Sequence, residues 1–258
     1  MHSDPNPAAI VFEDVSKSFG PRAILQHQTF TVDASEIFVV IGPSGSGKSV
    51  TLRLASGQLR PDSGTIRILG EDIVSADAKA RDALRRRMGY LFQGGALLGW
   101  MTLAENVALP LRERGKLSAA EIDRRVTEAL AEVGLAEAGS CYPSEVSGGM
   151  VKRAAFARAM ADAPELLFFD EPTSGLDPVM SRAIDALIVR LNQRLGAACV
   201  VVTHDLAGAL AYAHRIVFLK DGHFTAPLTP HELLQSEDAD IRAFLSAQHP
   251  EVSHGRIQ

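Results

Sequence analysis

The chain has 258 residues, of which 46% are hydrophobic and 22% are charged, which leaves room for one large α/β domain with an ordinary core. Its formal net charge of −5 lacks the basic excess of a nucleic-acid-binding protein. Two cysteines do not suggest a disulfide framework, and no apolar run approaches the roughly 20 residues that cross a bilayer, so a membrane process would need another chain to do the spanning.

Strands dominate the prediction for the first third of the chain. Runs of apolar and β-branched residues are separated by turn residues, such as those at 61–64. The predicted elements are strands over 10–15, 29–33, 37–41 and 65–69, a helix over 78–87, and a core strand over 88–92.

A glycine-rich loop follows the strand over 37–41 and leads into a helix predicted to begin near Gly47. It matches the pattern G-x-x-x-x-G-K-[ST] over Gly42-Pro43-Ser44-Gly45-Ser46-Gly47-Lys48-Ser49. Glycines at this spacing let backbone N–H groups converge on phosphates, and the helix N-terminus adds its positive dipole end. Lys48 would reach the outer phosphates, and the Ser49 hydroxyl would ligate Mg²⁺. A plain glycine-rich turn is the alternative, but the complete spacing favours a nucleotide-binding P-loop.

The middle of the chain predicts helices. Ser118 and Glu121 form a predicted capping box, followed by an apolar stripe at 122, 126, 130 and 133 that ends before Gly134. A second helix is predicted from about Gly148 to residue 161, before Pro164. This helical block lies between strand-rich segments and therefore indicates an inserted subdomain.

Short strands return over 166–169, 199–203 and 216–220, alternating with helices. This alternation predicts a mainly parallel sheet covered by helices. The first of these strands ends in Asp170 and Glu171. In a P-loop fold, an Asp at this place holds Mg²⁺ and the next carboxylate can polarise a water aimed at the γ-phosphate, whereas a solvated turn is the alternative.

Three further positions have both a functional and an ordinary interpretation. Ser147-Gly148-Gly149-Met150 opens a helix with bare N–H groups, which suits an anion but also suits a plain Ser N-cap. Gln93 follows a strand and can face Mg²⁺ or water, with a surface glutamine as the alternative. His204 also follows a strand, where it can donate a hydrogen bond to a γ-phosphate. Phe19 can stack on adenine or belong to the core.

In order along the chain, these segments resemble the motifs of the ATP-binding cassette (ABC) ATPase family, over nearly the whole sequence. The signature segment makes the resemblance specific, because a P-loop also occurs in kinases and GTPases. The matching motifs are Walker A at 42–49, the Q-loop at Gln93, the signature at 147–150, Walker B at 166–171, the D-loop at 174–177, the switch histidine His204 and the adenine-stacking aromatic Phe19.

The resemblance implies a P-loop NTPase core with a mainly parallel sheet, an N-terminal antiparallel β-subdomain and an inserted α-helical subdomain. The implied division is a core over about 10–92 and 164–225, a helical subdomain over about 93–163, and C-terminal helices and a tail over 226–258.

The resemblance also implies an ATPase in which two copies of the chain, head-to-tail, hold ATP and Mg²⁺ between them. Hydrolysis removes the bridging γ-phosphate and lets the copies part. The implied catalytic residues are Glu171, His204 and Gln93, and the implied metal ligands are Ser49, Gln93 and Asp170. The implied nucleotide contacts are Phe19, Gly42, Pro43, Ser44, Gly45, Ser46, Gly47, Lys48, Ser49, Val50, Ser147, Gly148, Gly149 and Asp177.

The implied partners are permease chains, with this chain peripheral on the cytoplasmic face of the inner membrane. The apolar loop over 94–101 resembles the site that receives a permease's coupling helix, with a core contact as the alternative. Segments 92–97 and 101–107, Met150 and the run 152–155 are similar to the ATPases of Mla/Mce-type phospholipid transport systems. That likeness implies a membrane-tethered lipid-binding chain and a role in outer-membrane lipid asymmetry.

Some features depart from the family pattern. Val146 replaces the usual Leu before the signature serine, and Phe19 replaces the commoner Tyr. The tail over 249–258 is short, so we do not expect the subunit-clasping extension of Mla relatives. Three other functions stay open: a small-solute importer, for example of amino acids; a cassette ATPase acting on DNA, ribosomes or iron–sulfur assembly; and a cassette that binds ATP without hydrolysing it. The presence of Glu171 and His204 argues against the last.

Overall fold

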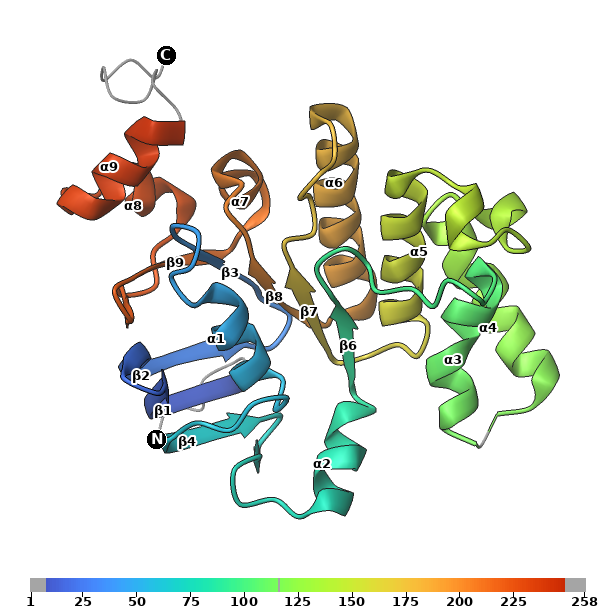
Figure 1. The fold of residues 1–258 in the computed structure, drawn as a ribbon, viewed down its shortest axis with the longest axis horizontal. Helices are drawn as coiled ribbons and strands as arrows, with labels where there is room; N and C mark the ends of the chain where they lie inside the picture. The colour runs from blue at the N-terminus through green and yellow to red at the C-terminus, as the bar shows by residue number, and fades with distance from the viewer. Residues whose placement is uncertain (1–7, 116, 249–258) are drawn as a thin grey trace. The chain divides into compact units, whose positions relative to one another are not determined.

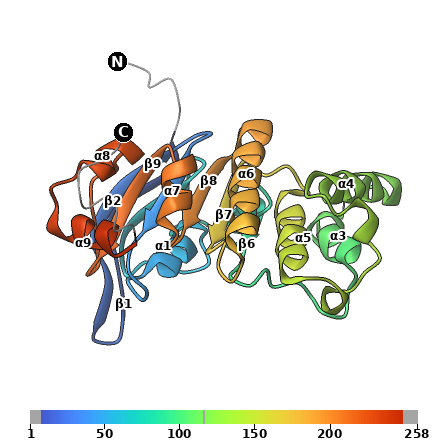
Figure 2. The ribbon, with the colours of Figure 1, turned by 90° about the horizontal axis from the view of Figure 1, so that it is seen from above.

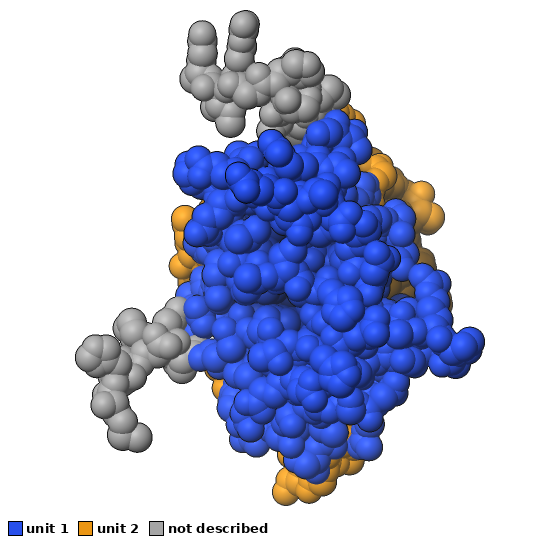
Figure 3. All heavy atoms as spheres, turned by 90° about the vertical axis from the view of Figure 1, so that its left-hand side faces the viewer, with its two compact units in different colours: residues 1–75, 200–258 blue, residues 76–199 orange. Residues whose placement is uncertain are grey.

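The structure is a computed structural model that describes residues 8–115 and 117–248. The chain forms two compact units: a first unit of residues 1–75 and 200–258, and a second unit of residues 76–199 (Figure 3). The division into core, helical subdomain and C-terminal helices stays a prediction, and the tail over 249–258 lies outside the described residues.

An antiparallel sheet forms much of the first unit (Figure 1). Its strands, in the order β2-β1-β4-β5, are β1 (Ala8–Phe19), β2 (Arg22–Asp33), β4 (Ser63–Ile68) and β5 (Glu71–Asp72). Phe12 pairs with Phe30 on one side and Ile66 on the other, and its ring stacks on Phe30 with centroids 4.4 Å apart. The predicted antiparallel β-subdomain is therefore confirmed.

A six-stranded sheet has the order β10-β9-β3-β8-β7-β6. The strands are β3 (Ile37–Ile41), β6 (Met88–Leu91), β7 (Leu166–Asp170), β8 (Ala198–Val202), β9 (Arg215–Lys220) and β10 (His223–Phe224). β3 pairs with β9 and β6 with β7 in parallel, while β10 is antiparallel to β9. Every residue of β3, β7 and β8 is buried, as expected for a parallel sheet covered on both faces. The mainly parallel sheet is confirmed.

The helices follow the two units. The first unit has α1 (Lys48–Ala55), α7 (Leu206–Tyr212), α8 (Pro230–Leu234) and α9 (Ala239–Gln248). The second unit has α2 (Ala78–Arg85), α3 (Leu103–Glu113), α4 (Ala119–Glu132), α5 (Gly148–Met160) and α6 (Pro178–Leu195), with 3₁₀ turns η1 (Ala136–Ala138) and η2 (Pro143–Glu145). In the second unit, α3, α4 and α5 pack against one another (Figure 2). No helix in the described part of the chain is both long and apolar enough to cross a membrane.

The start of α4 differs from the predicted capping box. Ser118 Oγ accepts a hydrogen bond from the Glu121 backbone N–H at 3.2 Å, so half of the box is formed. The Glu121 carboxylate instead accepts from Arg124 and Arg125, which lie one turn further along. Two guanidinium groups are stronger partners for a carboxylate than one neutral backbone N–H, which explains the difference.

Candidate functional site

The loop after β3 owes its shape to glycine. Gly42, Gly45 and Gly47 have φ values of 152°, 76° and 110°, in a region that disfavours side chains. A Cβ atom on Gly47 would lie 2.7 Å from Ile24 Cγ2, and one on Gly42 would overlap the Leu219 carbonyl oxygen. Neighbouring strands of the first unit therefore leave space for glycine alone at both positions.

The polar groups of this loop suit an anion. The Lys48 ammonium donates to the carbonyl oxygens of Gly42 and Pro43 at 2.9 and 3.0 Å. Ser46 Oγ is buried without a hydrogen-bond partner among the described residues, and Gly47 gives α1 no side-chain cap. A buried hydroxyl without a partner and an uncapped helix N-terminus both gain from a bound phosphate. Arg22 Nη2 donates to the Gly45 carbonyl and lines a hollow of about 480 Å³ beside the loop.

The other candidates of the first unit lie at strand ends and in the first turn of α1. Phe19 ends β1 with its side chain 51% exposed, so the alternative of a core phenylalanine is wrong. The Lys17 ammonium lies 5.5 Å from the centre of that ring. His204 is exposed after β8, while Ser49 and Val50 are half-buried in α1.

The two candidate carboxylates of the second unit are held differently. Asp170 ends the fully buried strand β7 and is itself 5% exposed. Glu171 is half-buried with φ at 49°, a left-handed conformation that costs a non-glycine residue about 1 kcal/mol. The Glu171 carbonyl accepts from the Ser174 N–H at 3.2 Å, which closes the turn that follows. A strained residue held by its surroundings is typical of functional sites.

Ser147 begins α5 as an N-cap, accepting from the Met150 backbone N–H at 3.3 Å. Gly148 is exposed, and a Cβ on Gly149 would lie 3.1 Å from Met180 Cε of α6. The ordinary capping interpretation is thus correct for the serine hydroxyl, and the exposed helix start still faces solvent. Asp177 also acts as an N-cap, its Oδ1 accepting from Val179 and Met180 at the start of α6. Nucleotide contact at Ser147, Gly148, Gly149 and Asp177 stays a prediction.

Gln93 is exposed in the loop after β6. The Gly95 N–H donates to the Phe92 carbonyl at 2.8 Å, so a tight turn brackets Gln93. Arg158 of α5 donates to the carbonyl oxygens of Gly95 and Ala96, both at 2.8 Å. The predicted apolar loop over 94–101 includes Trp100, whose side chain is 74% exposed, so a simple core contact is wrong for that residue.

The sequence analysis assigned no role to two buried polar side chains of the second unit. Lys152 is 7% exposed, and burial lowers the pKa of its ammonium while the charge of Glu171 opposes that effect. Asn106 is fully buried and bonds to the backbone of Leu98, Met101 and Thr102. A polar residue on an otherwise apolar helical face is the sequence feature that could have predicted these buried side chains. Cys199, by contrast, is an inert core thiol, because burial raises its pKa to about 12.

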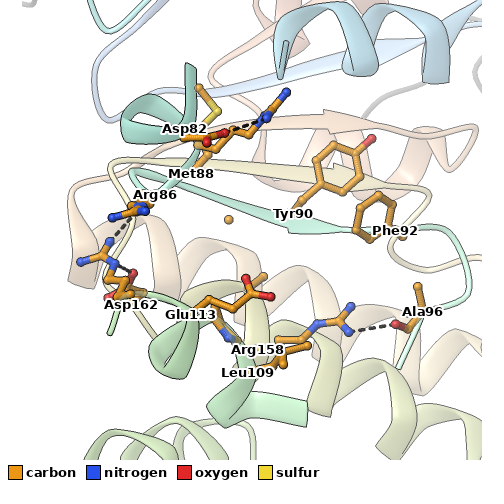
Figure 4. A pocket seen from close by; sticks show the side chains of 15 residues that line it. Asp82, Arg86, Met88, Tyr90, Phe92, Ala96, Leu109, Glu113, Arg158 and Asp162 are labelled. Carbon is orange, nitrogen blue, oxygen red and sulfur yellow. Dashed lines mark hydrogen bonds and ion pairs between the residues drawn. The ribbon is translucent and has the colours of Figure 1, made fainter. Parts of the chain in front are cut away.

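A groove of about 470 Å³ also lies within the second unit (Figure 4). Tyr90 and Phe92 line one side, with ring centroids 4.3 Å apart, and Leu109 and Glu113 of α3 line another. Arg114 pairs with Asp162 at its margin, and Asp82 pairs with Arg85 at 3.1 Å. Glu113 makes no ion pair among the described residues, and its carboxylate points into the groove (Figure 4). The groove therefore combines aromatic walls with both carboxylate and guanidinium groups, since Arg86 and Arg158 also line it.

A family model described as ABC transporter matches residues 25–174. Among curated proteins, the intermembrane phospholipid transport system ATP-binding protein MlaF of Escherichia coli K12 is 42% identical over 232 residues, covering 90% of this chain and 86% of MlaF. The probable ribonucleotide transport ATP-binding protein mkl of Mycobacterium tuberculosis H37Rv is 40% identical over 244 residues, covering 95% of this chain and 68% of mkl.

Solved structures of similar fold are ATP-binding cassettes. The dimeric bacterial ABC transporter cassette MJ0796 is 32% identical with a TM-score of 0.80, covering 86% of this chain and 98% of the cassette. The same cassette was also solved as a post-hydrolysis dimer bound to ADP and Pi, with a TM-score of 0.79 and the same coverage. The motifs between 42 and 171 fall within the residues 25–174 that the family model matches.

Proposed function

This chain belongs to the ABC transporter family, and we propose that it is the ATP-hydrolysing subunit of a transporter that moves phospholipid between membranes and so maintains outer-membrane lipid asymmetry. The observation that carries the lipid assignment is 42% identity to MlaF across 90% of the chain. The chain would lie at the cytoplasmic face of the inner membrane, held there by its partners. A small-solute importer is the competing assignment, and the likeness to mkl gives ribonucleotide as one candidate solute.

The triphosphate binds at the loop over 42–49. In the structure, Lys48 Nζ is shared between two carbonyl oxygens and Ser46 Oγ has no partner among the described residues. The outer phosphates supply the negative oxygens that the ammonium and the hydroxyl then bind, and the exposed Phe19 ring offers a face for adenine. Lys48→Ala is expected to weaken ATP binding itself, and unchanged affinity in a binding titration would contradict this role.

We propose Mg²⁺ as the cation, from the chemistry of three side chains. Ser49, Gln93 and Asp170 offer hydroxyl, amide and carboxylate oxygens, which are the hard ligands that Mg²⁺ prefers. When bound, the ion neutralises charge on the outer phosphates. The side chains of the chain supply the remaining catalysis. Glu171 orients and polarises the attacking water, and His204 donates a hydrogen bond to the γ-phosphate.

A second copy of the chain completes each site. The exposed start of α5, at Ser147 and Gly148, would present its N–H groups to the nucleotide held by the other copy. The dimeric cassettes among the structural relatives support this arrangement. ATP then holds two copies together by its charge, and loss of the γ-phosphate weakens that attraction.

The groove of the second unit is the proposed docking place for a permease. Its aromatic side at Tyr90 and Phe92 suits the apolar face of a short helix, and the Glu113 carboxylate suits a Lys or Arg on that helix (Figure 4). Glu113→Lys is expected to release the permease while leaving ATP binding unchanged.

Purification of the chain with its membrane partners tests the assignment. The complex, extracted in mild detergent, should contain a permease, a membrane-tethered lipid-binding chain and phospholipid detectable by mass spectrometry. A complex that holds a small-solute-binding protein and no phospholipid would overturn the lipid assignment. Tight binding to DNA without any membrane partner would overturn the transport function as well.

A further inference from the structure

Three cationic side chains of α5 bind backbone carbonyls of three different loops, all within the second unit. Lys152 donates to the carbonyls of Pro172 and Ser174, Arg158 to those of Gly95 and Ala96, and Arg153 to those of Val133 and Gly134. Two of these loops carry residues with proposed catalytic roles. The third joins α4 to η1 and carries none.

The Lys152 ammonium is satisfied by one short segment. Its donors reach the carbonyl oxygen of Pro172 at 3.1 Å, that of Ser174, and the Ser174 hydroxyl at 3.4 Å. A buried ammonium needs such acceptors, because leaving its charge without hydrogen bonds in the interior is costly. The contact therefore fixes the path of the chain after Glu171, where the backbone is already in the left-handed region.

Arg158 acts in the same way on the loop after Gln93. Its guanidinium places two N–H groups on successive carbonyls, those of Gly95 and Ala96, each at 2.8 Å. The contact with Ala96 is drawn in Figure 4. Gly94, Gly95 and Ala96 all have positive φ, so the loop takes a tightly specified path. A planar two-donor fork holds orientation as well as distance.

We propose that Lys152 and Arg158 are positioning residues, through which α5 fixes the orientation of Glu171 and Gln93 for ATP hydrolysis. The same helix begins at Ser147 and Gly148, so the segment proposed to meet the other copy's nucleotide is rigidly joined to both loops. Binding at the start of α5 thereby stabilises the arrangement of both catalytic loops. This inference rests on the proposed roles of Glu171 and Gln93.

The test measures steady-state ATPase activity and equilibrium ATP affinity of the full-length chain. Lys152→Met removes the ammonium but keeps an unbranched apolar side chain of similar length. We expect kcat to fall about 10- to 100-fold with KM and ATP affinity within about twofold, since misplacing a catalytic group by about 1 Å costs on this order. Lys152→Arg, which keeps a cationic donor, should recover part of the lost kcat.

Arg153→Met is the matched control, since it removes two carbonyl contacts of the same helix at 2.8 and 3.2 Å. It should lower Tm as much as Lys152→Met while leaving kcat unchanged. Arg158→Lys keeps the charge at a half-buried position and loses the fork, so it should fold even if Lys152→Met does not, and its kcat should also fall at unchanged affinity.

Two outcomes separate this inference from the proposed function. If Glu171→Gln abolishes turnover while Lys152→Met and Arg158→Lys keep wild-type kcat, the positioning role is wrong and the ATPase assignment stands. If Glu171→Gln itself turns over ATP normally, the catalytic assignment fails. A fall in kcat for Arg153→Met equal to that for Lys152→Met would reduce the effect to general destabilisation and also overturn the inference.

Discussion

The loop over 42–49 and the start of α5 are both proposed to bind phosphate, yet they are built by different means. The first takes its shape from the backbone, with three glycines at positive φ and neighbouring atoms that exclude side chains at Gly42 and Gly47. The second belongs to a helix whose cationic side chains, Lys152 and Arg158, bind carbonyls of distant loops. The loop over 42–49, the backbone cradle, is shaped by its own glycines. The helix α5 acts as a joint, meaning that its side chains hold two separate loops in place.

This difference determines which kind of substitution disrupts each region. A backbone cradle fails when an atom is added, because there is no space for it. A joint made by side chains fails when a donor is removed, because buried carbonyls and charges lose their partners. Variants of both kinds can therefore separate binding of the nucleotide from its hydrolysis.

The largest effect on ATP turnover is expected at Glu171, in the loop that Lys152 of α5 contacts. Glu171→Gln keeps the shape of the side chain but removes the carboxylate that polarises water, so turnover should fall about 10²- to 10⁴-fold. ATP binding should persist, and the variant should accumulate as an ATP-bound dimer in size-exclusion chromatography. Wild-type turnover, or a monomer at saturating ATP, would contradict the role of Glu171.

Asn106→Ala tests whether a buried side chain also holds a loop that has no proposed catalytic role. The Asn106 amide accepts from Leu98 N–H at 2.7 Å and donates to the carbonyls of Leu98, Met101 and Thr102 at 3.0–3.1 Å. Its loss leaves buried backbone groups without partners and should cost about 2–4 kcal/mol in denaturant unfolding. Trp100, the single tryptophan, lies in that loop, so its fluorescence anisotropy should fall.

Asn192→Ala is the control, as another buried amide whose side chain donates to the Ala197 carbonyl at 2.9 Å. Because Asn192 lies in α6, away from the loop over 94–101, its loss should leave the Trp100 signal unchanged. Equal anisotropy in the two variants would show that Asn106 does not hold the loop.

Gly42→Ala tests the backbone cradle. The added Cβ would overlap the Leu219 carbonyl oxygen, so the loop or β9 must shift, which should cost about 1–3 kcal/mol and weaken ATP binding. Gly70→Ala is the matched control: φ is also positive there, at 85°, but nothing lies within 4 Å of the added atom. A loss of stability as small as that of the control would mean that the close approach at Gly42 is unimportant.

The sequence predicts the backbone cradle well and the joint poorly, for physical reasons. The pattern over 42–49 is local, since each glycine is needed by the loop itself, and the apolar strands beside it show their burial directly. The contacts of Lys152 depend on Pro172 and Ser174, about 20 residues away, which no local pattern encodes. The roles of the predicted site residues in hydrolysis stay predictions for the same reason.

Three elements, α3, β1 and β2, differ from the prediction because polar residues dilute the apolar pattern. α3 was not predicted, although Thr102 and Glu105 form a complete capping box, because Pro110 and the buried Asn106 interrupt its periodicity. β1 and β2 were predicted to be short, because the hairpin they form continues through polar residues to a turn at Gly20, where φ is 57°. Tertiary pairing, not local propensity, sets these lengths.

The smallest expected effect is at Glu121, whose contacts are partly exposed to solvent and belong to neither phosphate-binding region. Hydrogen bonds from Arg124 first, and then Arg125, lower the pKa of this carboxyl from 4.5 to about 2. A carboxyl with a depressed pKa in the folded state adds stability above its unfolded pKa, and that stability is lost as the pH falls from about 4.5 towards 2. Glu121→Gln should therefore flatten the dependence of unfolding free energy on pH in this window, by a small amount because exposed ion pairs are screened. The control is Glu137→Gln, at an exposed position without an ion pair in the described part of the chain, and it should leave the slope of unfolding free energy against pH unchanged. Equal slopes for the wild type and Glu121→Gln would contradict the depressed pKa.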